Sequence, residues 1–273
     1  MIALCPNPYR DIDLALTSKA VSILESEGFE CVVLPVFSGS SGKKRLKDFK
    51  DKLSLAIVIG GDGTILSVAG DAHEIDVPLL GVNLGTKGFM ASIEPENIDL
   101  IRKAAKGEYK VSRRMMLDVF LRRNESDEYI GAALNDAVIH GYGECVEISV
   151  RCCGEKITAF SGDGVVFATP TGSTGYSMSA GGPIVEPEAQ SIIVSPICAH
   201  AMGSRSFVLD SHRTVSAKAT IVYGRKAYLS VDGSSGINLQ NGDEIVVKRS
   251  EKCISMVDLG VKSFYETAFE KLY

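Results

Sequence analysis

The chain has 273 residues and a mass of 29.2 kDa, enough for one large domain or two of ordinary size. Its 45% hydrophobic and 23% charged residues are typical of a globular protein and exclude the collagen-like, coiled-coil and disordered classes. The 29 Lys and Arg residues against 34 Asp and Glu give a net charge of −5, without the basic excess that nucleic-acid binding needs. We therefore expect no nucleic-acid partner.

The sequence shows neither a targeting or membrane-spanning segment nor a metal-binding pattern of cysteines. No signal-peptide pattern occurs at the N-terminus, and no apolar run approaches the ~20 residues of a membrane span, so we expect a cytoplasmic protein with no membrane partner. The 7 cysteines form no Cys-x-x-Cys pair and no zinc-ligand spacing with a histidine. Adjacent Cys152 and Cys153 are predicted to point to opposite faces of a strand, so we expect structural thiols.

Residues 1–108 alternate short apolar runs with helical periodicity, which predicts a doubly wound, Rossmann-like α/β domain with a parallel sheet. The expected strands are 2–5, 31–37, 53–59 and 78–82. The expected helices are 11–27, which ends at Gly28, and 95–106, which begins at Pro95. The charged segment 43–52 is expected to be a solvated face; the alternative is that it helps to hold a polyanion.

Residues 109–257 show the alternation of antiparallel strands, which predicts a mostly antiparallel, β-sandwich-like domain rich in turns. The expected strands are 115–121, 129–139, 145–151, 156–160, 165–168, 214–222, 226–231 and 244–249. An amphipathic helix at 263–272 is expected to return to the first domain, so that residues 258–273 join residues 1–108.

The most informative motif is Gly-Gly-Asp-Gly-Thr at residues 60–64, between an apolar strand and a helix-compatible segment. Glycines and the free N–H groups of a helix start suit a phosphate, although the motif is neither a Walker A loop nor a Gly-x-Gly-x-x-Gly fingerprint. Asp62 would repel phosphates unless it binds a cation or accepts a proton, so the loop predicts phosphoryl transfer. The alternative is a surface β-turn.

Two further glycine-rich loops follow apolar strands. Residues 81–90 contain Phe89, which is expected either to line a ring-binding site or to pack in the core. Residues 169–183 are dense in hydroxyl groups and glycines and include Tyr176. Such a loop offers many small donors for the sugar, amide and phosphate groups of a nucleotide, and a flexible linker is the alternative.

The motifs at 60–64, 135–136, 161–164 and 169–183 together resemble, in order and spacing, the signature motifs of the NAD kinases. Segments 81–89, 114–117, 196–205, 232–233 and 264–272 resemble the rest of that family, so the resemblance covers nearly the whole chain. It implies transfer of the ATP γ-phosphoryl group to the adenosine 2′-hydroxyl of NAD, with Mg²⁺, to make NADP. It also implies a homodimer or homotetramer in which a neighbouring subunit completes the NAD site.

The resemblance assigns Asp62 as the catalytic base toward the 2′-hydroxyl. It implies substrate or nucleotide contacts for Gly61, Gly63, Thr64, Phe89, Asn135, Asp136, Asp163, Thr174, Gly175, Tyr176, Ser177 and Ser179. The vicinal hydroxyls of a ribose are donors that need acceptors, which the Asn135 amide and the Asp136 carboxylate provide.

The chain departs from the family pattern at four positions. Asp136 replaces a commoner Glu, Gly175 the usual Ala, Ser234 a frequent Gln, and Lys87 a frequent apolar residue. Lys87 is expected either to approach a phosphate or to point to solvent.

Two other residues invite functional assignments. His200 is expected to be structural, and Arg205 to pair either with phosphate or with an internal carboxylate. Two other functions also stay open. A lipid or sugar kinase shares the acid-containing loop but needs an apolar channel or sugar-phosphate-binding arginines, and a non-catalytic NAD-binding regulator has no need of Asp62.

Overall fold

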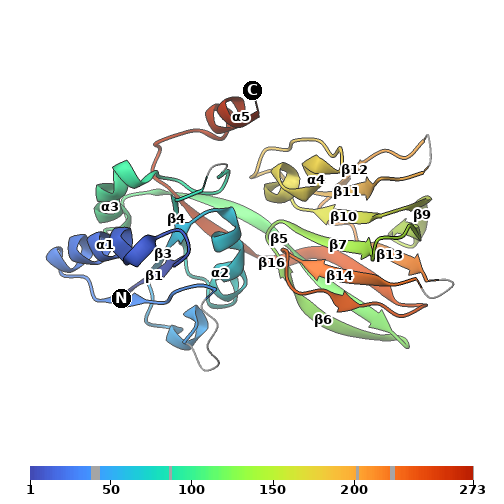
Figure 1. Cartoon of the computed structure of the whole chain (residues 1–273), viewed down its shortest axis with the longest axis horizontal. Helices are drawn as coiled ribbons and strands as arrows, with labels where there is room; N and C mark the ends of the chain where they lie inside the picture. The colour runs from blue at the N-terminus through green and yellow to red at the C-terminus, as the bar shows by residue number, and fades with distance from the viewer. Residues whose placement is uncertain (38–43, 86–87, 201–202, 222–224, 273) are drawn as a thin grey trace. The chain divides into compact units, whose positions relative to one another are not determined.

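The computed structural model of the chain describes residues 1–37, 44–85, 88–200, 203–221 and 225–272 (Figure 1). The chain divides into unit 1, which comprises Met1–Arg114 with Cys253–Tyr273, and unit 2, which comprises Met115–Lys252. Among the residues that the structure describes, no helix is both long and apolar enough to cross a membrane.

Unit 1 is built on a parallel sheet of strand order β2-β1-β3-β4. These strands are β1 (Ile2–Pro6), β2 (Cys31–Val33), β3 (Leu55–Gly60) and β4 (Leu79–Asn83). The end of the long strand β16 (Glu244–Asp258) pairs in parallel with β4 through Met256 and Leu79. All residues of β1, β3 and β4 are buried, as expected for strands that are covered on both faces.

Helices cover both faces of this sheet. Helices α1 (Ala15–Ser26) and α3 (Ile101–Ala105) share one core cluster with alternate residues of the strands, such as Ile57 and Leu80. Helix α2 (Asp62–Ile75) packs on β3 and β4, where a Cβ on Gly81 would lie 2.8 Å from Ile65 Cδ1. The remaining helical segments of the unit are the 3₁₀ turns Ile12–Leu14, Leu46–Phe49 and Pro95–Leu100 and the C-terminal helix α5 (Phe264–Leu272). The doubly wound α/β prediction is therefore confirmed.

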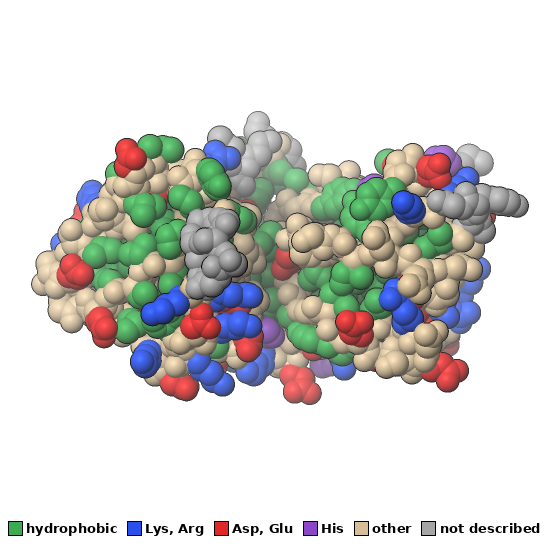
Figure 2. All heavy atoms as spheres, turned by 60° about the horizontal axis from the view of Figure 1, so that its bottom comes forward, with side chains coloured by type: hydrophobic (Ala, Val, Ile, Leu, Met, Phe, Trp, Pro, Cys, Tyr) green, Lys and Arg blue, Asp and Glu red, His purple; other side chains and the backbone are tan. Residues whose placement is uncertain are grey.

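The described part of the charged segment, residues 44–52, is held against α2. Arg45 donates from Nε to Asp71 Oδ2 at 2.9 Å and from Nη2 to Asp71 Oδ1 at 2.5 Å, and Leu46 is buried. On the face that Figure 2 shows, Lys and Arg side chains are interspersed with Asp and Glu side chains rather than gathered in a patch of one sign. The segment thus has a structural anchor as well as a solvated face.

Unit 2 contains two layers of antiparallel strands. One layer is formed by β5 (Lys110–Arg123), β6 (Ser126–Ala133), β8 (Val146–Cys152), β9 (Glu155–Gly162), β13 (Val215–Thr220) and β16. The other has the order β12-β11-β10-β7-β14-β15. Its strands are β7 (Asp136–Gly141), β10 (Gly164–Ala168), β11 (Ser191–Ile197), β12 (Phe207–Asp210), β14 (Ala227–Val231) and β15 (Ile237–Asn238). A single core cluster joins Val150 and Phe160 of the first layer to Ile139 and Phe167 of the second, which confirms the β-sandwich-like prediction.

Several strands differ from the sequence-based expectation. The predicted strand 129–139 is two strands, because the chain turns at residues 134–135 between β6 and β7. Strand β16 continues well beyond residue 249, and β11 and β12 were not predicted. Cys153 does not continue the strand of Cys152: its φ of 50° places it in the turn between β8 and β9.

Candidate functional site

Asp62 is the first residue of α2, directly after strand β3. The preceding residue, Gly61, is extended with φ −98° and ψ −175°, and no side chain caps the helix. The first N–H groups of a helix have no partner within it, and the helix dipole adds positive potential there. The turn therefore offers donors for a phosphate beside one carboxylate.

Gly60 and Thr64 explain the tightness of this turn. A Cβ on Gly60 would lie 2.3 Å from Thr64 Oγ1, so only glycine leaves room for the threonine side chain. Thr64 is 2% exposed, and Asn7 Nδ2 donates to its hydroxyl at 3.3 Å. In this structure the Thr64 side chain braces the loop from within.

The Asp62 carboxylate is held by a second loop of unit 1. The backbone N–H of Phe89 donates to Oδ2 at 2.8 Å, and that of Met90 donates to Oδ1 at 3.2 Å. Burial raises the pKa of Asp62, while these two N–H groups and the Lys271 ammonium of α5 oppose the rise. The carboxylate thus keeps a fixed orientation and an increased proton affinity, both of which suit a general base.

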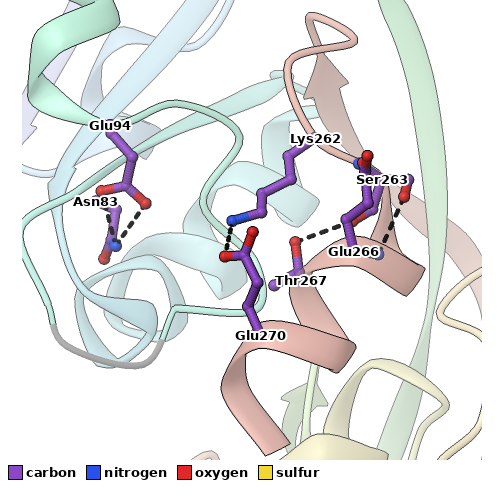
Figure 3. Close-up of polar contacts among 7 residues, drawn as sticks. All are labelled: Asn83, Glu94, Lys262, Ser263, Glu266, Thr267 and Glu270. Carbon is purple, nitrogen blue, oxygen red and sulfur yellow. Dashed lines mark hydrogen bonds and ion pairs between the residues drawn. The ribbon is translucent and has the colours of Figure 1, made fainter. Parts of the chain in front are cut away.

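Asn83, at the end of β4, braces the loop that reaches Asp62 (Figure 3). Its Nδ2 donates to both Glu94 oxygens at 3.0 Å, and its Oδ1 accepts from the Gly85 N–H at 2.9 Å. A Cβ on Gly88 would lie 2.9 Å from Asn83 Oδ1, so the loop passes close to this side chain. Lys87 lies outside the described residues.

Helix α5 belongs to unit 1 and has a well-defined start. The Ser263 N–H donates to Glu266 Oε2 at 2.7 Å, and the Glu266 N–H donates to Ser263 Oγ at 3.1 Å, a reciprocal cap (Figure 3). Lys262, just before the helix, forms an ion pair with Glu270 near its end. This cap fixes where the helix begins, and the helix carries the Lys271 charge that acts on Asp62.

In unit 2, Asn135 and Asp136 stand where β7 begins and β10 ends. Thr169 directly follows the last residue of β10, and its N–H donates to Asn135 O at 2.9 Å. Asp136 is 7% exposed, and burial, followed by repulsion from the Asp232 carboxylate, raises its pKa to about 7. This end of the sheet therefore carries a carboxyl group whose charge changes near neutral pH.

Asn135 offers a buried acceptor atom that the protein itself does not satisfy in the part of the chain that the structure describes. Its Oδ1 is buried and has no hydrogen-bond partner among the residues that the structure describes, which is costly for a polar atom. A Cβ on Gly175 would lie 3.3 Å from Asn135 Nδ2, a close contact. The acceptor lies at the loop that sequence analysis singled out, and a donor from a ligand would satisfy it.

The loop at 169–183 folds into the 3₁₀ turn Thr171–Thr174 and the short helix α4 (Tyr176–Ser179). Ser177 is fully buried, with Oγ 3.1 Å from Ser195 Oγ, whereas Ser179 is exposed. Tyr176 is 38% exposed and stacks on His140, whose ring is 6.5 Å away at 18°. Tyr176 is therefore accessible to a ligand, Thr174 is half-buried with its Oγ1 3.3 Å from Thr171 O, and Ser177 stabilises the loop.

Asp163 is not brought together with Asn135 within the chain. It precedes β10, whereas Thr169 follows it, and the strand between them spans about 20 Å at 3.3 Å per residue. Cys145 Sγ donates to Asp163 Oδ1 at 3.9 Å, and His200 Nε2 lies 3.8 Å from the same sulfur. Asp163 thus lies at the opposite end of β10 from Asn135, yet it remains near Tyr176, whose pKa is raised first by burial and also by the charges of Asp163 and Asp136.

The residues left open by the sequence have local contacts. The His200 N–H donates to Ser161 O at 2.7 Å, Arg205 donates to Ser204 O at 3.0 Å, and Ser234 Oγ accepts from the Val231 N–H at 3.1 Å. Sequence analysis gave no role to Asp232 or His140. An Asp-Gly pair after a strand signals only a turn, and nothing in the sequence indicates that the Asp232 carboxylate folds back onto residues 134–136.

Comparison with known proteins gives consistent matches along the chain. Residues 13–109 match the ATP-NAD kinase N-terminal domain, and residues 134–259 match the ATP-NAD kinase C-terminal domain. An NAD kinase of Natranaerobius thermophilus is 35% identical over 99% of this chain and 97% of its own length. An NAD kinase of Aquifex aeolicus is 42% identical over 84% of this chain and 85% of its own length.

Solved structures show the same fold. Yeast NADH kinase complexed with NADH has a TM-score of 0.85 at 26% identity, over 99% of this chain and 86% of that one. An NAD kinase from Archaeoglobus fulgidus in complex with ATP has a TM-score of 0.79 at 24% identity, over 100% of this chain and 98% of that one. The architecture of both units thus has a counterpart among known structures.

Proposed function

Because this chain belongs to the ATP-NAD kinase family, we propose that it transfers the γ-phosphoryl group of ATP to the adenosine 2′-hydroxyl of NAD and so makes NADP. The observation that carries the proposal is Asp62, a single carboxylate placed at the uncapped N-terminus of α2. A phosphate site alone has no use for that charge, whereas phosphoryl transfer to a hydroxyl needs a base.

In the proposed reaction Asp62 accepts the proton of the 2′-hydroxyl as the oxygen attacks the γ-phosphorus, while the bond from that phosphorus to the β–γ bridging oxygen breaks and ADP leaves. The N–H groups of Phe89 and Met90 hold the carboxylate in one orientation and leave further lone pairs on its oxygens for the hydroxyl. Gly61 and Gly63 allow the substrate to approach the backbone, and the helix start stabilises the negative charge of the transferred group.

We assign NAD binding to residues that offer acceptors and an aromatic ring. Asn135 Oδ1 and the Asp136 carboxylate are acceptors for hydroxyl or amino donors of the adenosine, and the unpartnered Oδ1 supports this assignment. Tyr176 supplies an accessible hydroxyl group and a ring face, and Thr174 supplies a half-buried hydroxyl group. Further contacts with the substrates are proposed for Phe89, Asp163, Gly175 and Ser179. Thr64 and Ser177 are buried, and we assign them the role of holding their loops in the conformation that binds the substrates.

Three further properties are proposed from the family resemblance: dependence on Mg²⁺, assembly into a homodimer or homotetramer, and a cytoplasmic location. Mg²⁺ prefers phosphate oxygens and water, so it is proposed to enter with ATP rather than on a site of its own. When bound with ATP, the ion neutralises phosphate charge. In an oligomer, a neighbouring subunit's polar cluster around Asp163 is proposed to complete the NAD site.

The test is incubation of the purified protein with ATP, Mg²⁺ and NAD, with NADP measured by a dehydrogenase specific for it. Parallel reactions replace NAD with diacylglycerol or a sugar phosphate, and light scattering on a sizing column gives the oligomeric state. NADP formation that requires both ATP and Mg²⁺ supports the proposal. Phosphorylation of lipid or sugar in place of NAD, or NAD binding without any NADP, would refute it.

A further inference from the structure

The carboxylate of Asp232 collects three consecutive backbone N–H groups. Leu134 donates to Oδ2 at 2.7 Å, and Asn135 and Asp136 donate to Oδ1 at 2.8 and 3.0 Å. The Asp232 N–H in turn donates to Asp136 O at 2.9 Å. The two segments, almost 100 residues apart in the sequence, are therefore joined by four hydrogen bonds.

This convergence requires an unusual backbone on both sides. Successive N–H groups of a strand point in opposite directions, so three can meet one carboxylate only where the chain turns, as it does between β6 and β7. Asp232 itself has a φ of 47°, in the left-handed region that a side chain adopts only at an energetic cost. That cost is offset by hydrogen bonds to a charged acceptor.

The same turn is held from its other side by the end of β10. Thr169 Oγ1 donates to Leu134 O at 2.6 Å, and the Thr169 N–H donates to Asn135 O at 2.9 Å. A Cβ on Gly172 would lie 2.1 Å from Asn135 O, so the loop packs directly on this carbonyl. With both its N–H and its carbonyl groups fixed, the backbone determines where the Asn135 and Asp136 side chains can reach.

We propose that Asp232 is a positioning residue for NAD: its carboxylate fixes residues 134–136 so that Asn135 Oδ1 and the Asp136 carboxyl group face the adenosine. The inference rests on the proposed function, because it assigns Asp232 a task in that same site. Asp232 touches no reacting atom; it acts through the two side chains that it orients.

Asp232 lies close enough to Asp136 for their repulsion to raise the pKa of Asp136, an electrostatic cost that a neutral Asn or Ser would not impose. A neutral side chain, however, has one acceptor oxygen and cannot serve three N–H groups from both sides. The charge is therefore explained by the need to hold this turn in a single conformation.

The test compares wild type with Asp232→Asn and Asp232→Ser, and uses Asp243→Asn as the matched control. Asp243 is another buried aspartate of unit 2, 4% exposed, whose carboxylate accepts the Gln240 N–H at 2.7 Å. Each protein is measured for kcat, for KM of NAD and of ATP, for calorimetric NAD affinity, and for amide exchange in peptides that contain residues 134–136. Circular dichroism checks folding.

We expect both Asp232 variants to raise KM for NAD about tenfold or more, with KM for ATP unchanged and faster exchange at residues 134–136. Asp243→Asn should lower the unfolding temperature and leave KM for NAD unchanged. An unchanged KM for NAD in active, folded Asp232 variants would overturn this inference and leave the proposed function intact. Unfolding of both variants would make Asp232 a determinant of folding and would also overturn it. A wild type that neither binds NAD nor makes NADP would overturn the proposed function and the inference together.

Discussion

Replacing Asp62 with Asn separates the chemistry of its carboxylate from its shape. The amide keeps the size of the side chain but loses basicity, and general-base assistance contributes about 10²–10⁴-fold to rate. At 1.36 kcal/mol per tenfold, the barrier should rise by about 3–5 kcal/mol. One oxygen also becomes an NH₂ group that faces the N–H of Phe89 or Met90, so one of the bonds at 2.8 and 3.2 Å is lost. That loss should lower the free energy of unfolding by about 1.5–3 kcal/mol.

The assay pairs steady-state NADP formation with calorimetric NAD affinity and urea unfolding. The matched control is Asp71→Asn, on the same helix, which removes the buried partner of Arg45 and should lower stability without slowing turnover. For Asp62→Asn we expect kcat to fall about 10²–10⁴-fold while NAD affinity changes far less. Because burial raises the pKa of Asp62, wild-type kcat should decline as pH falls through that pKa, and the variant should lose this limb. Turnover within about tenfold of wild type would remove Asp62 from catalysis.

Three other changes test the remaining site and the core. Tyr176→Ala should chiefly raise KM for NAD, because the ring and phenol bind the ligand but do not accept a proton at neutral pH; a large fall in kcat at saturating NAD would contradict this role. Asp136 has a pKa near 7 in the fold, so NAD affinity should fall as pH drops below about 7, and Asp136→Asn should flatten that dependence in calorimetry. The pKa of Asp136 is higher in the folded than in the unfolded chain, so this group favours folding most below about pH 4 and loses that contribution as the pH rises through about 7. The free energy of unfolding of wild type, measured relative to that of Asp136→Asn, should therefore be lower at pH 8 than at pH 4. Phe167→Ala should lower the free energy of unfolding by about 3–5 kcal/mol in urea titrations, against about 0.5 kcal/mol or less for the exposed control Val208→Ala; similar losses for both would refute the assignment of the core.

The sequence was sufficient to predict a strand where the local pattern of residues agrees with the environment of that strand in the fold. Strands β3 and β4 are continuous apolar runs followed by glycine-rich loops, and their positions in a parallel sheet follow from that pattern. The break at residues 134–135 was missed because the Asn135-Asp136 pair is only a weak turn signal, and the turn is imposed by Thr169 and Asp232, which directly follow strands β10 and β14. Strand β11 was missed because it is buried on both faces, lacks alternation and contains Pro196.

In the candidate site, too, some features could be predicted from the sequence and others could not. Asp62 could be singled out because its chemistry is encoded within five consecutive residues. The orientation of its carboxylate could not, because it depends on the N–H groups of Phe89 and Met90, which a second strand and Asn83 bring into place. Sequence spacing therefore identifies which side chain reacts, whereas the partners that orient it come from distant segments and require the fold.

The discontinuity of unit 1 has a consequence for the order in which the protein is made. Its first segment ends at Arg114, yet the strand that pairs with Leu79 of β4 contains Met256 and is synthesised only after the whole of unit 2. A ribosome-bound chain therefore lacks the strand partner of Leu79 while more than half of the protein is still being translated, although Ile93 already pairs with Val82 farther along the same edge. The helix that bears Lys271 is synthesised later still, so the electrostatic environment of Asp62 is completed only after unit 2 and α5 have both been made.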